Sequence, residues 1–288
     1  ARRRGRLLNN TPAPHLKSTR HDSFANVCLQ LSHGRLGFPP PASMRKQGFS
    51  VPDSFFSAVA ACARARSADR EHTGRVTTDS TAVCDFKGRF PPAKGGGCTS
   101  LIAFRHPVSG YVHEEYLVDQ TVPTAVAAFV SFRDRMRVKF RVTIDYMVFD
   151  RDASFNRKFR AALLTLGVDS NMSGANDHWE LGAIETYWDT WTSMVAAFTM
   201  HAGLDATYWR FASGMANYIL NRTPTSSNLG YDVSPIEYLT NEVPSLSHLR
   251  IPFSPSFVAQ EKKKGALGCR ALEGIFVGYP EDTRDGVW

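Results

Sequence analysis

Three acidic residues, Asp85, Asp150 and Glu185, occupy positions from which carboxylates could converge on a metal site. Asp85 lies in a β-rich run, Asp150 closes another such run, and Glu185 lies in the first turns of a long helical pattern. Open α/β sheets place ligands at the carboxyl ends of their strands. Carboxylate oxygens suit Mg²⁺ or Mn²⁺, and two such ions can hold a phosphoryl group for in-line displacement. From spacing alone, each residue could equally be an ordinary surface acid, because the chain holds 27 acidic residues.

The order of strand and helix patterns around these residues predicts an α/β core with a mixed sheet. Short β-rich runs separated by turn residues indicate an antiparallel meander, and the run Gly95-Gly96-Gly97 indicates a hairpin turn. Apolar stripes at helical spacing follow. In chain order we expect strands at 81–86, 99–104 and 111–118, a helix opening at Pro123, a strand at 141–149, a helix capped by Asn156 and ending at Gly167, a short strand near Val168, helices at 181–201 and 205–221, a short helix after Pro235, and β-like segments at 249–257 and 274–279.

Positive charge is concentrated in the first quarter of the 288-residue chain. The formal net charge is +7. Residues 1–74 carry 12 basic and 4 acidic side chains, a net +8, so residues 75–288 carry a net −1. A basic segment of this kind indicates a polyanionic partner. The near-neutral remainder would need metal ions to contact phosphate.

Composition excludes two classes of protein. No apolar run approaches the ~18–20 residues that a membrane-spanning helix needs, which excludes an integral membrane protein. The five cysteines are dispersed and form no C-x-x-C pair. This usage indicates a reducing, intracellular setting and not a secreted disulfide scaffold.

Seven short motifs occur in this chain: Glu-Thr-Tyr-Trp-Asp-Thr from 185, Ala-Asn-Tyr-Ile-Leu-Asn-Arg-Thr-Pro-Thr from 216, Ser-Pro at 234–235, Leu-Ser-His-Leu-Arg at 246–250, Gly-Ile-Phe-Val-Gly-Tyr at 274–279, Asp-Phe-Lys-Gly-Arg-Phe-Pro-Pro from 85, and Asp-Arg-Asp-Ala-Ser-Phe from 150. Together they resemble the integrase region of copia-type LTR retrotransposon Pol polyproteins. The match covers roughly residues 29–288 and is strongest after 182.

The resemblance implies a ribonuclease-H-like core with a five-stranded mixed sheet flanked by helices. It also implies metal-dependent DNA 3′-end processing and strand transfer, with Mg²⁺ or Mn²⁺ in a two-metal site. The implied partners are element-end and target DNA and further copies of the chain, with no membrane and no small-molecule substrate. The implied location is the nucleus or a cytoplasmic virus-like particle.

Carried over residue by residue, the two aspartates and the glutamate of the family fall on Asp85, Asp150 and Glu185. The family usually has 35 residues between its second Asp and its Glu, and this chain has 34. Asp79 competes for the first position, because residues 76–79 also resemble a strand end. Asp85 is favoured because Gly88 and Pro91 follow it at the distances of the family motif.

The resemblance divides the chain into four parts. Residues 1–28 form a basic, disordered arm, 29–74 a degenerate pre-integrase zinc-finger-like module, 75–240 the catalytic core, and 241–288 a truncated β-rich segment. In the module, His33 and Cys62 match two of the four zinc ligands of the family, whereas Phe38 and Val59 stand at the other two. We therefore expect no bound zinc, since a structural site needs four N or S donors.

Other departures leave the activity of this copy open. Asp152, Ala153 and Ser154 replace residues that the family usually has after its second aspartate, and Glu180 replaces an upstream Gln. Added acid there would repel a phosphate backbone. The alternatives are a catalytically dead, drifted copy that keeps the fold and non-specific DNA binding, or a structural α/β domain with neither role.

Overall fold

The computed structural model describes residues 79–150, 155, 157–172, 178–224, 233–259 and 271–280. The predicted arm and zinc-finger-like module, with His33 and Cys62, lie outside these residues, as do Asp152, Ala153 and Ser154. The predictions for those segments therefore stay predictions.

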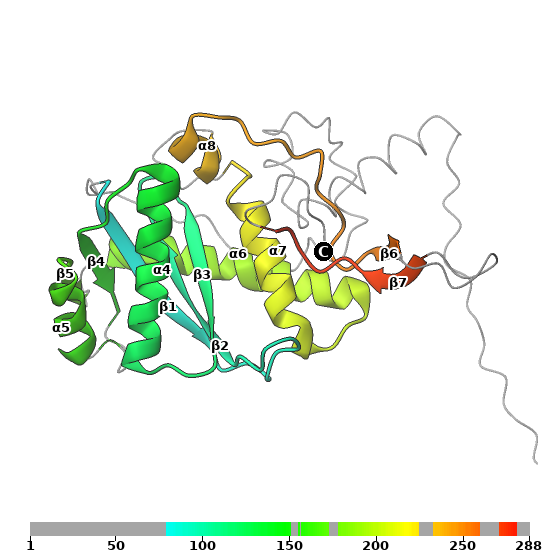
Figure 1. Cartoon of the computed structure of the whole chain (residues 1–288), viewed down its shortest axis with the longest axis horizontal. Helices are drawn as coiled ribbons and strands as arrows, with labels where there is room; N and C mark the ends of the chain where they lie inside the picture. Colours follow the sequence, from blue (N-terminus) through cyan, green and yellow to red (C-terminus); the bar gives the residue numbers. More distant parts are fainter. Residues whose placement is uncertain are drawn as a thin grey trace, which may run out of the picture.

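Five strands form one mixed sheet in the order β3–β2–β1–β4–β5 (Figure 1). Strand β1 pairs antiparallel with β2, and β2 pairs antiparallel with β3. On its other side β1 pairs parallel with β4, and β4 pairs parallel with β5. The strands are β1 (Thr81–Gly88), β2 (Ser100–Arg105), β3 (Val112–Leu117), β4 (Tyr146–Phe149) and β5 (Asp169–Met172).

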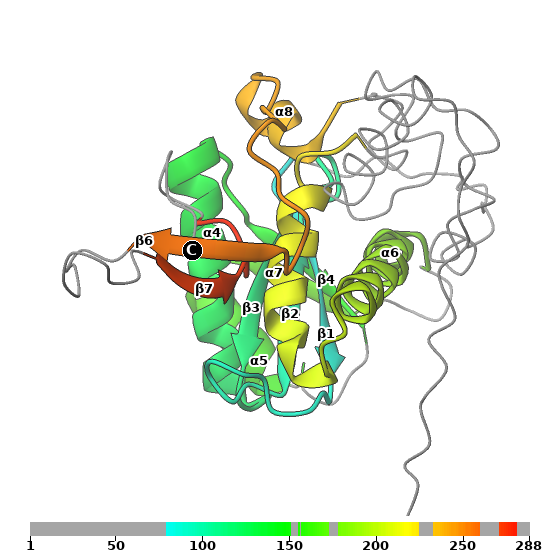
Figure 2. The ribbon, with the colours of Figure 1, turned by 90° about the vertical axis from the view of Figure 1, so that its right-hand side faces the viewer.

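Helices cover both faces of this sheet, and each face has its own apolar core. Helices α4 (Val122–Phe140) and α5 (Arg157–Thr165) bury Phe129, Phe132 and Phe159 against one face. Helices α6 (His178–Ala202) and α7 (Trp209–Leu220), joined by the short 3-10 helix η2 (Ala206–Tyr208), cover the other. Figure 2 shows the sheet between α4 and α6. The fold is therefore an α/β core with a five-stranded mixed sheet flanked by helices, as predicted.

Local sequence explains where the long helices begin and end. Helix α4 has a proline in its first turn, which suits a position whose N–H needs no partner, and ends at Arg141 in the left-handed conformation (φ 62°). Helix α6 buries its predicted apolar stripe, including Ile184, Trp191 and Phe198, and Gly203 (φ +65°) follows its last turn. Both helices therefore behave as amphipathic covers for a sheet face.

Three sequence-based strand predictions were placed wrongly. The fourth strand was expected over 141–149 but spans only Tyr146–Phe149, because α4 continues to Phe140 and the chain must turn before it joins β1. The last two β-like segments were expected at 249–257 and 274–279. They are instead β6 (Pro255–Ala259) and β7 (Ala271–Ile275), a separate two-stranded sheet.

The residues displaced from those strands pack into the core beneath α7. Leu249, Phe253 and Phe276 are buried with the α6–α7 core, and Phe253 and Phe276 are joined by a backbone hydrogen bond of 3.0 Å. The alternation of apolar residues in this region reflected packing against a helix and not strand pairing. The segment after β7 therefore lies against the core.

Short helix α8 (Pro235–Thr240) follows a capping box. The Ser234 side chain accepts from the Glu237 backbone N–H, and the Glu237 carboxylate accepts in return from the Ser234 backbone N–H. No helix in the described part of the chain is long and apolar enough to cross a membrane.

Candidate active site

Asp85, within β1, and Asp150, the residue that follows β4, occupy neighbouring positions on two parallel strands. Cys84 of β1 is in register with Phe149 of β4, so the next residue of each strand brings the two aspartates together. Asp150 contributes to raising the pKa of Asp85, as expected for two close carboxyl groups. The fold thus makes two of the three predicted carboxylate residues neighbours.

The carboxylate of Asp85 is held by two hydrogen bonds. Its Oδ1 accepts from the Phe86 backbone N–H at 2.8 Å, and its Oδ2 accepts from the Trp188 indole Nε1 at 2.9 Å. Burial raises the pKa of Asp85 above its usual value, against the opposing effect of these two bonds and of Lys87. Lys87 also lies with its Nζ 5.6 Å from the centre of the Trp188 ring.

Glu185 lies on the exposed side of α6, one turn before Trp188. It does not join the two aspartates, since no group of three or more His, Cys, Asp or Glu residues among the described residues is placed to hold a metal ion. The fold thus brings together Asp85 and Asp150 and puts Glu185 on the helix that covers them. The assignment of Glu185 stays a prediction.

The chemistry of the aspartate pair fits a hard divalent cation. Two adjacent carboxylates repel each other, and each oxygen of Asp85 keeps a lone pair beyond its one hydrogen bond. A divalent cation between them would relieve the repulsion. Asp85 can therefore serve as an oxygen ligand while it keeps both hydrogen bonds.

The competing residue Asp79 lies at the opposite end of β1. It precedes Thr81, is exposed, and its backbone carbonyl accepts a hydrogen bond of 2.8 Å from Nε2 of His106. Because β1 and β4 are parallel, Asp79 is separated from Asp150 by the whole strand. The geometry therefore favours Asp85 as the partner of Asp150.

A further carboxylate, that of the buried residue Glu114 on β3, was missed by the sequence analysis. It is 8% exposed and accepts hydrogen bonds from Tyr187 at 2.5 Å, Ser213 at 2.6 Å and Tyr116 at 3.0 Å. Burial raises the pKa of Glu114 to about 7, although these donors act in the opposite direction. The signal for it was period-2 alternation, which puts Glu114 on the same face of β3 as Val112 and Tyr116.

Asp85 and Glu114 lie in one row across the sheet. Asp85 is in register with Ala103 of β2, and Ala103 is in register with Glu114 of β3. Consecutive residues of α6 bind them: Tyr187 donates to Glu114 and Trp188 to Asp85. One turn of α6 therefore fixes both carboxylates against the sheet.

No family model matches the sequence. Among solved structures, the chain is similar to the catalytic core domain of BIV integrase, with 13% sequence identity over 57% of this chain and 95% of that one and a TM-score of 0.43. It is also similar to the HTLV-2 integrase catalytic core domain in complex with magnesium, in a trimeric form, with 12% identity over 56% and 96% of the two chains and a TM-score of 0.43.

Proposed function

We propose that this chain is the integrase of a copia-type retrotransposon, which trims DNA 3′ ends and joins them to target DNA. The observation that carries the proposal is the placement of Asp85 within β1 beside Asp150, which follows the parallel strand β4, with Asp85 hydrogen-bonded to the helix that bears Glu185. The sequence motifs around these three residues support it. DNA ends, target DNA and further copies of the chain are its partners, in the nucleus or a virus-like particle.

In this proposal Asp85 and Asp150 hold a divalent cation, Mg²⁺ or Mn²⁺, and Glu185 completes the ligand set of a second. A bound cation neutralises phosphate charge and makes an attacking hydroxyl more acidic. In the joining step a DNA 3′-hydroxyl forms a new P–O bond as the target P–O bond breaks. The attacking hydroxyl gives up its proton and the leaving 3′-oxygen gains one. The protein residues position the reacting groups, and Trp188 orients Asp85.

The test is strand transfer by the purified full chain with an element-end DNA duplex and Mn²⁺. Asp85→Asn, Asp150→Asn and Glu185→Gln should each reduce product by at least about 10²-fold, because loss of a metal ligand should cost no less than loss of an outer-shell partner, which costs about 10–100-fold. Asp79→Asn is the matched control and should retain activity. Full activity in Asp85→Asn with loss in Asp79→Asn would reverse the assignment of the first carboxylate.

The second candidate is a drifted copy that binds DNA without chemistry. It is favoured by one observation: among the described residues, no three His, Cys, Asp or Glu side chains are grouped so that they could hold a metal ion. This candidate predicts salt-dependent DNA binding without strand transfer in either Mg²⁺ or Mn²⁺. Product formation that depends on Asp85 and Asp150 would exclude it.

A further inference from the structure

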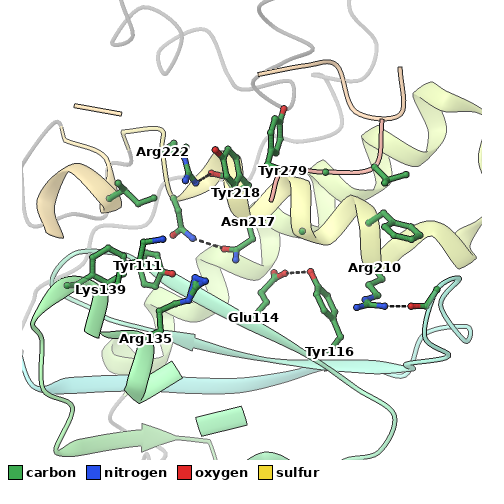
Figure 3. Close-up of a pocket in the computed structure, with 18 residues that line it drawn as sticks. Tyr111, Glu114, Tyr116, Arg135, Lys139, Arg210, Asn217, Tyr218, Arg222 and Tyr279 are labelled. Carbon is green, nitrogen blue, oxygen red and sulfur yellow. Dashed lines mark hydrogen bonds between the residues drawn. The ribbon is translucent and has the colours of Figure 1, made fainter. Parts of the chain in front are cut away.

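A groove of about 770 Å³ lies along the β3 edge of the sheet, between α4 and α7. Tyr116 and Glu114 of β3 form its floor, and the segment after β7 contributes Tyr279 (Figure 3). The volume is within the ~300–1,000 Å³ range of small-molecule sites. The aspartate pair is elsewhere: Asp85 lies on β1, two strands from β3, and Asp150 follows β4, three strands from β3.

The groove is strongly basic. Four cationic side chains line it: Arg135 and Lys139 from α4, Arg210 from α7, and Arg222 just after α7. In Figure 3, Arg135, Lys139 and Arg222 stand toward one end and Arg210 toward the other. Glu114 is the one carboxylate among the described lining residues. With the pKa of Glu114 raised to about 7, the lining carries a net charge between +3 and +4 at neutral pH.

Aromatic rings are stacked with two of these cations. The Arg222 guanidinium lies 3.4 Å from the centre of the Tyr218 ring, and Tyr218 stacks on Tyr279 with ring centres 4.2 Å apart and an interplanar angle of 18°. Arg210 lies 5.2 Å from the centre of the Tyr116 ring. A guanidinium held on a ring is oriented before a ligand arrives, which lowers the entropy cost of binding.

Hydrogen bonds connect the walls of the groove to the sheet and to the β1–β2 hairpin. The Asn221 side chain pairs with the backbone of Val112 through bonds of 2.9 and 2.7 Å, which extends the edge strand β3. Arg210 donates to the Gly95 carbonyl in the β1–β2 hairpin. The Asn-Arg-Thr-Pro motif thus puts Arg222 in the groove by anchoring Asn221 to β3. These contacts make a preformed site.

We propose that this groove binds a nucleotide, either free or as a unit of a nucleic acid strand, with phosphates on the arginines and lysine and the base against the tyrosine rings. Arginine suits phosphate because its planar donors match two oxygens at once. Rings interleaved with cations are the pattern of sites that bind single strands by stacking. An acidic peptide would match the charge of the groove but has no planar base to pack beside the tyrosine rings.

This inference goes beyond the proposed function, because the groove uses neither Asp85 nor Asp150. Binding there needs no divalent cation. It should therefore persist in EDTA and in the Asp85→Asn/Asp150→Asn double variant, whether or not the chain has strand-transfer activity. Failure of this inference and failure of the proposed function are then separate results.

The test is fluorescence anisotropy of labelled oligothymidylate with the full chain in EDTA, at several salt concentrations. Arg210→Gln/Arg222→Gln should weaken binding at least about tenfold and lower the salt slope by about 1.4, since each single-strand phosphate contact adds about 0.7. Arg137→Gln/Arg157→Gln is the matched control, because it removes the same charge from two exposed helical positions outside the groove. It should change binding less than about twofold.

Competition with the labelled oligonucleotide distinguishes a free nucleotide from a nucleic acid strand as the ligand of the groove. ATP without divalent cations should displace the oligonucleotide more effectively than inorganic triphosphate, because only ATP carries a base. If ATP fails while longer oligonucleotides bind through Arg210 and Arg222, the occupant is a nucleic acid strand. Equal displacement by inorganic triphosphate, or binding of polyglutamate in place of the oligonucleotide, would overturn the proposal.

A second variant tests the groove even if Arg210→Gln/Arg222→Gln fails to fold. Lys139→Glu changes an exposed residue of α4 and reverses one charge of the groove. It should weaken oligonucleotide binding by at least about fivefold with an unchanged circular dichroism spectrum. Equal loss in Arg137→Gln/Arg157→Gln and in the groove variants would show non-specific attraction and overturn the site.

Discussion

The indole Nε1 of Trp188 donates a hydrogen bond of 2.9 Å to Oδ2 of Asp85, and so joins helix α6 to the end of β1. The bond lowers the pKa of Asp85 and partly offsets the larger effect of burial, which raises it. Trp188 is 3% exposed and packs edge-on against Trp191 with ring centres 5.5 Å apart. The position of the candidate metal ligand is thus set by an aromatic residue of the core.

Trp188→Phe should raise the pKa of Asp85 further, because the carboxylate loses the indole donor. Hydrogen bonds to charged groups contribute about 1.5–3 kcal/mol, so the free energy of unfolding should fall by about that amount near neutral pH. Trp191→Phe is the matched control, since it removes an indole bond of 3.1 Å to Ser213 and leaves Asp85 untouched. Carbon-13 NMR titration of the Asp85 carboxyl group should show a higher midpoint in Trp188→Phe alone. Equal midpoints in the two variants would contradict a role for Trp188.

Sequence analysis could predict the core of this fold because the signals were local. Alternation in the β1 region, the apolar stripe of α6 and the glycine at 203 each specify an element without knowledge of the rest of the chain. Local signals also put Asp85 within one predicted strand and Asp150 at the end of another, and the parallel pairing of β1 with β4 makes these two residues neighbours.

What could not be predicted depended on contacts between distant segments. Glu114 acquires its role only when Tyr187, 73 residues later, donates to it. The stripe that contains Trp188 indicated a buried residue but not its bond to Asp85, 103 residues earlier. The 141–149 segment alternates like a strand, yet its first residues only connect α4 to β4. The length of this connection depends on where α4 ends, at Phe140.

Glu114 should make stability depend on pH between about 4.5 and 7. Its pKa is raised from 4.5 to about 7 in the folded chain, so in that range the folded state binds more protons than the unfolded state. The free energy of unfolding then falls as pH rises, by up to about 3 kcal/mol across the window. Glu114→Gln should remove this contribution and flatten the profile. Urea unfolding at a series of pH values measures it.

The control for Glu114→Gln is Glu242→Gln, which changes an exposed carboxylate. Its stability profile should follow that of the unmodified chain at every pH. A Glu114→Gln profile that keeps the full slope between pH 4.5 and 7 would show that other groups cause it, and the raised pKa of Glu114 would be wrong.

Mg²⁺ or Mn²⁺ should raise the melting temperature of the chain through Asp85 and Asp150. Occupancy at about 100 times Kd stabilises the folded state by about 2.7 kcal/mol, which corresponds to several degrees for a chain of this size. Asp150→Asn should abolish the shift, and Asp79→Asn should preserve it. Glu185→Gln should reduce the shift if its carboxylate joins the ligand set. A shift of the same size in Asp150→Asn, measured by differential scanning fluorimetry, would place the cation elsewhere.

Gly88, the last residue of β1, should tolerate no side chain, and its loss should disturb Asp85 three residues away. Its φ is +131°, and an added Cβ would lie 2.9 Å from both the Ser100 Cβ and the Thr99 carbonyl oxygen. Gly97 is the matched control, because its φ is +65° and an added Cβ would meet no atom within 4 Å. Both alanine variants bear backbone strain of about 1–3 kcal/mol, but only Gly88→Ala must also move β2, so it should lose at least about 2 kcal/mol more in urea unfolding. Equal losses of stability would mean that β2 can shift at Ser100 without a free-energy cost. The β1–β2 pairing would then not fix the position of Asp85.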